Sequence, residues 1–142
     1  MKKEFEEIKT GVIGVGSMGQ NHARVLNDIS NLRGVFDNNK EQGRKVANSL
    51  ETKCYEDLDS LLDEVDAVSV VVPTRLHRSI SEHVINKGVN LLVEKPLSKN
   101  IDDSKKIVNL AKEKEVILAV GHIERFNPVV QYVKKALEEK KW

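Results

Sequence analysis

Several residue types that mark particular classes of protein are scarce in this sequence. The 142 residues include one cysteine, Cys54, so no disulfide can form within the chain, and no Cys/His cluster has the spacing of metal ligands. We therefore expect no metal site and a reducing, intracellular setting. Aromatic residues make up 4% of the sequence, and the formal net charge is +1 with basic residues scattered along the chain. Neither a stacking platform nor a basic patch is available, which argues against nucleic-acid binding.

Long apolar runs are also missing. No run approaches the ~20 residues that span a bilayer. The first ten residues mix acidic and basic side chains and do not resemble a signal peptide. These features predict a cytoplasmic protein with no membrane partner. A length of 142 residues accommodates one domain with its own core but not two.

Short β-branched runs alternate with longer amphipathic segments, which is the pattern of a parallel sheet covered by helices. Short loops and right-handed crossovers favour a Rossmann-like, doubly wound α/β fold with the strand order 3-2-1-4-5-6. We expect residues 1–126 to form this single domain and residues 127–142 to form an amphipathic helix beyond it. The expected strands are 8–14, 33–37, 53–55 (weaker), 67–72, 89–93 and 116–120, and the expected helices are 18–28, 40–50, 58–64, 76–87 and 101–114.

A glycine-rich stretch, GVGSMG, joins the first expected strand to the first expected helix. Its glycines, Gly14, Gly16 and Gly19, have the spacing G-x-G-x-x-G. In this context the first glycine permits a tight turn, the second lets a pyrophosphate approach the backbone, and the third allows close packing of helix on strand. The helix N-terminus offers unpaired N–H groups and a positive dipole to the phosphates. We therefore predict a dinucleotide site that includes Ser17 and Met18 in the first helical turn.

An acidic residue lies where this fingerprint requires one. Asp37 ends the second expected strand, about 20 residues beyond the glycines, where a carboxylate accepts hydrogen bonds from a ribose 2′-hydroxyl and repels a 2′-phosphate. This favours NAD over NADP and argues against a chance cluster of glycines, and we group Asn38 with Asp37 as cofactor-binding. Asp37, Asn38 or Asn39 could also cap the following helix. Lys40 or Arg44 could reach a 2′-phosphate, or could lie on a solvated helix face.

Two further polar stretches, VVPTRLH and LLVEKPLS, begin in expected strands and continue past their carboxyl ends. Ligands of open α/β sheets bind at this edge. We therefore expect a second group of side chains near the glycine loop: Pro73, Thr74, His77, Glu94, Lys95 and Pro96. His22 and His83 fall within expected helices, and we interpret both as structural.

The segments GVGSMGQNHARVL, VVPTRLH, NLLVEKPLS and VGHIERFNP together resemble the amino-terminal half of the Gfo/Idh/MocA oxidoreductases. The resemblance runs from about Lys9 to Pro128, and the E-K-P element is its most specific part. It implies a Rossmann domain that holds NAD or NADP and, in the family, precedes an α/β domain that binds a sugar, polyol or related substrate. Hydride would pass between the nicotinamide and a hydroxyl-bearing carbon of a sugar or nucleotide sugar. The sequence looks most similar to members that oxidise UDP-linked N-acetylated amino sugars at the 3-hydroxyl.

The resemblance also implies roles for individual residues. The E-K-P lysine, here Lys95, would be catalytic, because in the family it lies near the nicotinamide and the reacting carbinol. A desolvated ammonium there could act as acid, base or hydrogen-bond donor, whereas the alternative is a solvated loop lysine. Glu94 would contact a ribose, and Pro96 would fix the turn that aims Lys95.

The remaining implied cofactor contacts are Pro73, Thr74 and His77, in the loop beside the nicotinamide half, and Arg125, where cofactor and substrate meet. His77 could instead cap or pack at the start of a helix. Arg125 could instead pair with Glu124 or another neighbour.

An apolar stripe lies on the last expected helix, formed by Val129, Val130, Val133, Ala136 and Leu137. In the family this helix leads into the substrate domain, which the 142 residues do not include. Here it could fold back on the sheet, join a second copy in a homo-oligomer, or leave an apolar patch. A chain of this kind is expected to bind a dinucleotide but to be a poor catalyst alone. The alternative function is a non-catalytic NAD-binding sensor or regulatory module.

Overall fold

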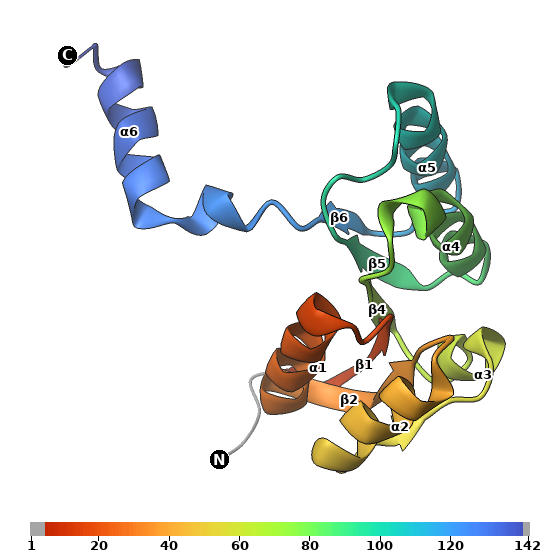
Figure 1. Ribbon diagram of the computed structural model, residues 1–142. Coiled ribbons are helices and arrows are strands. Elements are labelled where there is room, and N and C mark those ends of the chain that lie inside the picture. Colours follow the sequence, from red (N-terminus) through yellow and green to blue (C-terminus); the bar gives the residue numbers. More distant parts are fainter. Residues whose placement is uncertain (1–4, 141–142) are drawn as a thin grey trace.

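The structure, a computed structural model, describes residues 5–140 (Figure 1). At its centre is a six-stranded parallel sheet in the order β3-β2-β1-β4-β5-β6. This order confirms the doubly wound topology predicted from the sequence. The strands are β1 (Phe5–Ile13), β2 (Ser30–Phe36), β3 (Lys53–Cys54), β4 (Ala67–Val70), β5 (Asn90–Val93) and β6 (Leu118–Val120).

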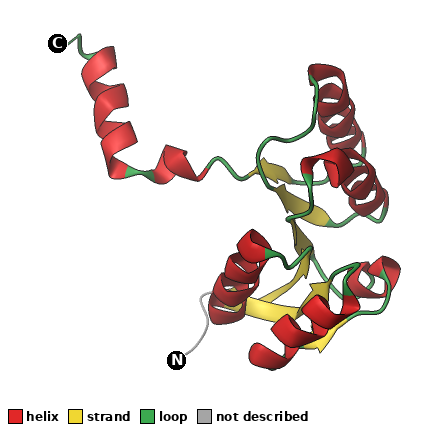
Figure 2. Cartoon of the chain, in the orientation of Figure 1, coloured by secondary structure: helices red, strands yellow, loops and turns green. Residues whose placement is uncertain are grey.

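Helices follow the strands in alternation, as Figure 2 shows. The crossovers between parallel strands are helical, as a βαβ fold requires. Within residues 5–140, none of the helices has the length and apolar character that crossing a bilayer requires. The helices are α1 (Ser17–Ile29), α2 (Lys40–Ser49), α3 (Leu58–Leu62), α4 (Thr74–Asn86), α5 (Ile101–Glu113) and α6 (Pro128–Glu138), with a 3₁₀ turn, η1 (Ile123–Phe126), before α6.

The sheet separates two apolar clusters, one on each face. Successive side chains of a strand point to opposite faces, so Val12 joins a cluster with Ala23 of α1 and Val46 of α2, whereas Ile13 joins the other. The second cluster also contains buried residues of α3, α4 and α5. A strand that is apolar on both faces is typical of a central parallel sheet. The two layers hold the carboxyl ends of β1, β2, β4 and β5 in fixed register at one edge.

The boundaries of some elements differ from the sequence expectation. The strand expected at 116–120 begins only at Leu118. The reason lies in the preceding turn: Val116 N–H donates to Ala111 O of α5 (2.9 Å), and Ile117 N–H donates to the Asn90 side chain (3.0 Å). Neither amide is therefore available to the ladder. The first strand, in turn, begins at Phe5 rather than at residue 8.

Helix α6 lies apart from the sheet (Figure 1). It begins at Pro128, with Asn127 as its N-cap, close to the expected start at residue 127. Its apolar stripe remains exposed, since Val129, Val133 and Leu137 retain 67%, 49% and 50% of their accessible surface. Folding back on the sheet, one of the alternatives from the sequence, is not what the structure shows.

Candidate functional site

A cavity of about 370 Å³ opens at the carboxyl edge of the sheet. It lies where the crossovers from β1 and β4 run in opposite directions, which is the usual place for ligands in open α/β sheets. Its walls come from the glycine loop, the end of β2 and the β4–α4 connection. The polar and loop residues lining it include Gly14, Gly16, Asp37, Asn38, Pro73 and Arg75.

The three glycines have different environments. Gly14 has a positive φ of 86°, and a Cβ there would lie 2.5 Å from Val71 O. A Cβ on Gly19 would lie 1.9 Å from Gly14 O. The fold therefore requires both glycines. A Cβ on Gly16 would meet no described atom within 4 Å, so the packing of the described residues does not require a glycine there. Its missing side chain instead leaves the approach to α1 open.

The N-terminus of α1 is suited to an anion. Its N-cap is Gly16, which provides no side-chain hydrogen bond, and no acidic residue lies in the first turn. The first amides of a helix have no intrahelical acceptor, and here they belong to Ser17, Met18 and Gly19. Helices α2, α3, α5 and α6, by contrast, are capped by the side chains of Asn39, Asp57, Asn100 and Asn127. Helix α4 also has no side-chain cap at Pro73, so α1 is distinguished by its open N-terminus beside Gly16, where its donors and positive dipole are available to a ligand.

Asp37 fixes the loop from the end of β2. Its Oδ2 accepts a hydrogen bond from Val15 N–H and its Oδ1 accepts one from Asn39 N–H, both at 2.8 Å. Asn39 Oδ1, in turn, accepts from Gln42 N–H at 3.1 Å and caps α2. The capping role that the sequence left open among three residues therefore belongs to Asn39. Each Asp37 oxygen retains a second lone pair, and Asp37 lines the cavity.

Lys40 and Arg44, the two cations that could approach a 2′-phosphate, are both paired with Glu56. Arg44 Nη2 lies 3.0 Å from Glu56 Oε1, and Lys40 Nζ lies 3.9 Å from Glu56 Oε2. The hydrogen bond from Arg44 lowers the pKa of Glu56, and Glu56 raises the pKa of Arg44 in return. Neither cation lines the cavity.

Glu94, at the carboxyl end of β5, is held from two sides. Its Oε1 lies 3.1 Å from His22 Nε2 of α1, and its Oε2 accepts a hydrogen bond from Lys95 N–H at 3.0 Å. The carboxylate also packs against Gly121, where a Cβ would lie 3.1 Å from Oε1. His22, interpreted from the sequence as structural, thus connects the glycine-loop helix to the E-K-P loop.

Lys95 itself is exposed. The described residues do not supply the desolvation on which its role as an acid or base depends.

His77 is buried, with 1% of its surface accessible. Its Nδ1 lies 2.8 Å from Pro96 O and its Nε2 lies 2.8 Å from Val72 O. Both ring nitrogens therefore face main-chain carbonyls, and neither is presented to the cavity. This arrangement corresponds to the packing alternative: His77 ties the start of α4 to the end of β4 and to the E-K-P loop.

The other residues expected around the nicotinamide half are not brought together. Pro73 lines the cavity as the N-cap of α4, and Thr74 is the first residue of that helix. Arg125 is exposed in η1 and lines a separate hollow with Val130, Gln131 and Lys134. The structure therefore does not place Arg125 with the glycine loop.

Sequence reasoning missed two residues of this site, Gln42 and Arg75. Gln42 Nε2 donates to Val15 O (2.9 Å) and so holds the glycine loop from α2. Arg75 is exposed and lines the cavity. The position of Arg75, directly after the P-T of VVPTRLH, is a local signal. The contact of Gln42 has none, because it depends on how two elements 27 residues apart meet.

A parallel sheet of this order, with this loop at its carboxyl edge, defines a Rossmann-type dinucleotide-binding domain. The model of an oxidoreductase family with an NAD-binding Rossmann fold, Gfo/Idh/MocA, matches residues 8–122. The chain belongs to this family, as its motifs indicate, and is an NAD-binding Rossmann domain.

Individual relatives agree with this assignment. The chain is 42% identical over 129 residues to UDP-N-acetylglucosamine 3-dehydrogenase of Acidithiobacillus ferrooxidans. The alignment covers 91% of this chain and 41% of that protein. The solved structure of that dehydrogenase superposes on this chain with a TM-score of 0.88. GenD2 from gentamicin A biosynthesis, solved in complex with NAD, is 34% identical with a TM-score of 0.80, covering 84% of this chain and 36% of that one. The chain thus spans about two fifths of the length of these relatives.

Proposed function

We propose that the cavity and the adjoining helix N-terminus bind NAD, with the diphosphate on α1 and the adenosine half between the glycine loop and the β4–α4 connection. The observation that carries this proposal is the uncapped start of α1 behind Gly16, where no side chain obstructs the approach. The amides of Ser17, Met18 and Gly19 donate to the diphosphate. Asp37 accepts from the adenosine ribose, with Asn38 beside it. Because Asp37 carries a negative charge at this position, the site prefers NAD to NADP.

In the whole protein, we propose, this domain serves a dehydrogenase acting on a sugar or nucleotide sugar. The name of the 42% identical relative, UDP-N-acetylglucosamine 3-dehydrogenase, supports a nucleotide sugar oxidised at a ring hydroxyl. Bound NAD supplies a hydride acceptor at its nicotinamide. Lys95 exchanges the hydroxyl proton and orients the substrate, while Glu94 holds the Lys95 backbone and contacts the nicotinamide ribose.

In the whole protein, Pro73, Thr74 and Arg125 complete the cofactor contacts, and His77 acts by positioning the E-K-P loop. Residues 1–126 form the cofactor domain in this proposal, and residues 127–142 lead toward a substrate-binding part. Residues 1–4 and 141–142 lie outside the described residues. A cytoplasmic location and assembly of copies through the apolar stripe of α6 belong to the same proposal. The non-catalytic NAD sensor is the competing function, and it has no use for Lys95.

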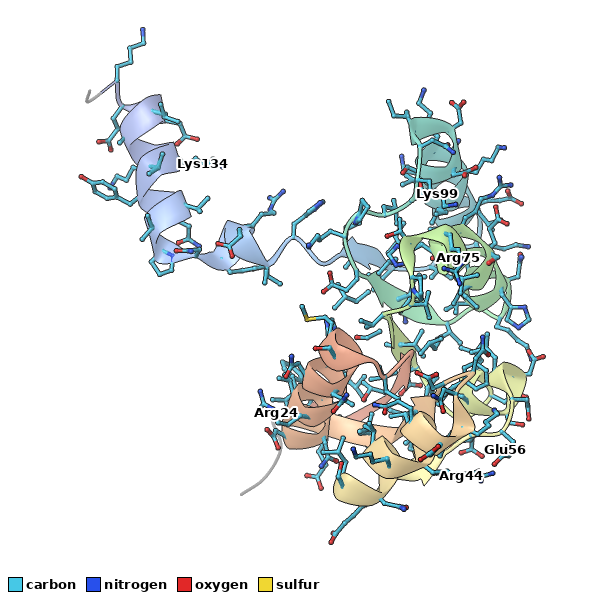
Figure 3. All side chains as sticks on the ribbon, in the orientation of Figure 1. Arg24, Arg44, Glu56, Arg75, Lys99 and Lys134 are labelled. Atoms are coloured by element: carbon cyan, nitrogen blue, oxygen red, sulfur yellow. The ribbon has the colours of Figure 1, made fainter. Side chains whose placement is uncertain are left out.

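Titration of the chain with NAD by calorimetry tests the binding proposal. Gly16→Val should lower NAD affinity by about tenfold or more, because the side chain fills the approach to the α1 amides. Its backbone, with φ −64° and ψ −163°, is accessible to valine, so the variant should fold. Arg24→Gln, an exposed change on the same helix (Figure 3), is the matched control and should bind as the wild type does. Equal affinity of Gly16→Val and wild type would contradict the proposed site.

A further inference from the structure

Glu56, an acidic residue outside the cavity, pairs with two neighbouring cations, Lys40 and Arg44. Glu56 lies between β3 and α3, directly before Asp57, the N-cap of α3. Its carboxylate is 3.0 Å from Arg44 Nη2 and 3.9 Å from Lys40 Nζ, and its main-chain carbonyl accepts a hydrogen bond from Lys40 Nζ. Arg44 and Glu56 lie side by side in Figure 3. Two basic side chains of α2 are therefore turned toward the β3–α3 connection.

Lys40 and Arg44 lie on the helix that follows Asp37, the residue proposed to bind the ribose. Lys40 is the first residue of α2 and follows Asp37 by three positions, and Arg44 lies one helical turn further on. Lys40 Nζ also lies 4.7 Å from the centre of the Phe36 ring, and Phe36 lines the cavity. A 2′-phosphate on a ribose bound at Asp37 would meet positive charge from α2 if these side chains were free.

We propose that Glu56 is a specificity-determining residue, which disfavours dinucleotides with a 2′-phosphate by holding Lys40 and Arg44 away from the ribose and by adding a negative charge beside them. The inference rests on the proposed NAD site and extends it. Asp37 acts on the ribose directly, whereas Glu56 acts through the two cations and is a positioning residue. Discrimination between NAD and NADP at the ribose 2′ position then depends on Asp37 and on three further side chains, those of Glu56, Lys40 and Arg44.

Because Glu56 and Arg44 are both exposed, variants at these positions can test the proposed role of Glu56 without disrupting the fold. The side chains of Glu56 and Arg44 retain 64% and 62% of their accessible surface, and exposed ion pairs contribute little to folding stability. A glutamate carboxylate is charged at neutral pH, and the hydrogen bond from Arg44 lowers the pKa of Glu56 further. Replacing it with glutamine therefore changes the local charge and the arginine partner, and leaves the core intact.

Glu56→Gln is the decisive variant, and its affinities for NAD and NADP are measured by calorimetry at one low salt concentration. NADP affinity should rise by about threefold to fivefold, the effect of one exposed charge contact. NAD affinity should stay within about twofold of wild type, because NAD carries no 2′-phosphate. The rise in NADP affinity should shrink at high salt, since exposed charges are screened.

Two further variants separate the inference from simpler explanations. Glu64→Gln removes an exposed carboxylate that pairs with Arg33 at 3.2 Å, outside the cavity, and should change neither affinity. The double variant Glu56→Gln with Arg44→Ala should lose most of the NADP gain, because the released guanidinium is its main source. A gain that persists in the double variant would contradict the role of Arg44.

The outcomes distinguish the inference from the function on which it rests. If wild type binds NAD and Glu56→Gln has the wild-type affinity for NADP, the inference is wrong and the NAD site stands. If the wild-type chain binds neither dinucleotide, the proposed function is wrong and the inference fails with it. If Glu64→Gln raises NADP affinity as much as Glu56→Gln does, net charge rather than the Glu56 contacts is responsible, which also overturns the inference.

Discussion

The two halves of the candidate site are built differently. At the adenosine side, β1, β2, α1 and α2 hold one another directly: Asp37 and Gln42 both bond to Val15 of the glycine loop. At the side expected for the nicotinamide, Lys95 is exposed, and Arg125 lines a hollow separate from the cavity at the glycine loop. Direct contacts between elements therefore fix the first half, whereas in the second half Glu94 and His77 are held but Lys95 and Arg125 remain exposed.

Obstructing the packed adenosine side of the site should have the largest effect. Gly19→Val places side-chain carbon where a Cβ already lies 1.9 Å from Gly14 O. The loop and α1 must move apart, so we expect a loss of more than about 2 kcal/mol in the free energy of unfolding, together with loss of NAD binding. Thermal and urea denaturation measure the first effect, and calorimetry measures the second.

Gly16→Ala is the matched control for stability, since a Cβ there meets open space. Its free energy of unfolding should equal that of wild type within about 0.5 kcal/mol. If both glycine variants were equally stable, the close packing described for Gly19 would be incorrect.

Removing the carboxylate of Asp37 should have the next largest effect. Asp37→Ala loses the ribose acceptors and releases Val15 N–H, so NAD affinity should fall by about tenfold to a hundredfold. NADP affinity should fall less, because repulsion of the 2′-phosphate is lost at the same time. Calorimetric titration with each dinucleotide gives the ratio. An unchanged preference for NAD in this variant would show that Asp37 does not read the ribose.

A smaller effect is expected in the open half. Lys95→Ala should leave the NAD affinity of this chain within about twofold of wild type, because the side chain is exposed and an exposed charge contributes little to binding. The same titration measures it. A tenfold loss would mean that the nicotinamide half is already formed in this chain, and the contrast between the halves would disappear.

The smallest effect concerns pH, away from both halves. Hydrogen bonds from the Ser60 N–H and hydroxyl lower the pKa of Asp57, the N-cap of α3, below its ordinary value of 3.8. A depressed folded-state pKa stabilises the fold above pH 3.8, and the contribution disappears as the pH falls through the lower folded-state value. Denaturation between pH 6 and pH 3 should show a shallower decline in stability for Asp57→Ala than for wild type. Parallel curves would contradict the assigned cause.

Local patterns were enough to predict the strand order, the glycine loop and the acid at the end of β2. These features depend on residues close together in sequence, such as Gly14 to Gly19, and on the alternation of strands and helices. Which of Asp37, Asn38 and Asn39 caps α2 was not predictable, because all three are suitable acceptors and the backbone decides among them. The contact between His22 and Glu94 joins residues 72 positions apart. No local pattern encodes it, and the same is true of the pairing of Glu56 with α2.

We propose that this chain forms the diphosphate and adenosine side of the NAD site and leaves the nicotinamide side open. The most direct test is to follow the backbone amides of the ¹⁵N-labelled chain by NMR during titration with NAD. We expect large shifts for Gly16, Ser17, Met18 and Gly19, and for Asn38 beyond Asp37, with small ones for Glu124 and Arg125. Shifts confined to the η1 turn and α6, with the glycine-loop amides unmoved at saturating NAD, would contradict it.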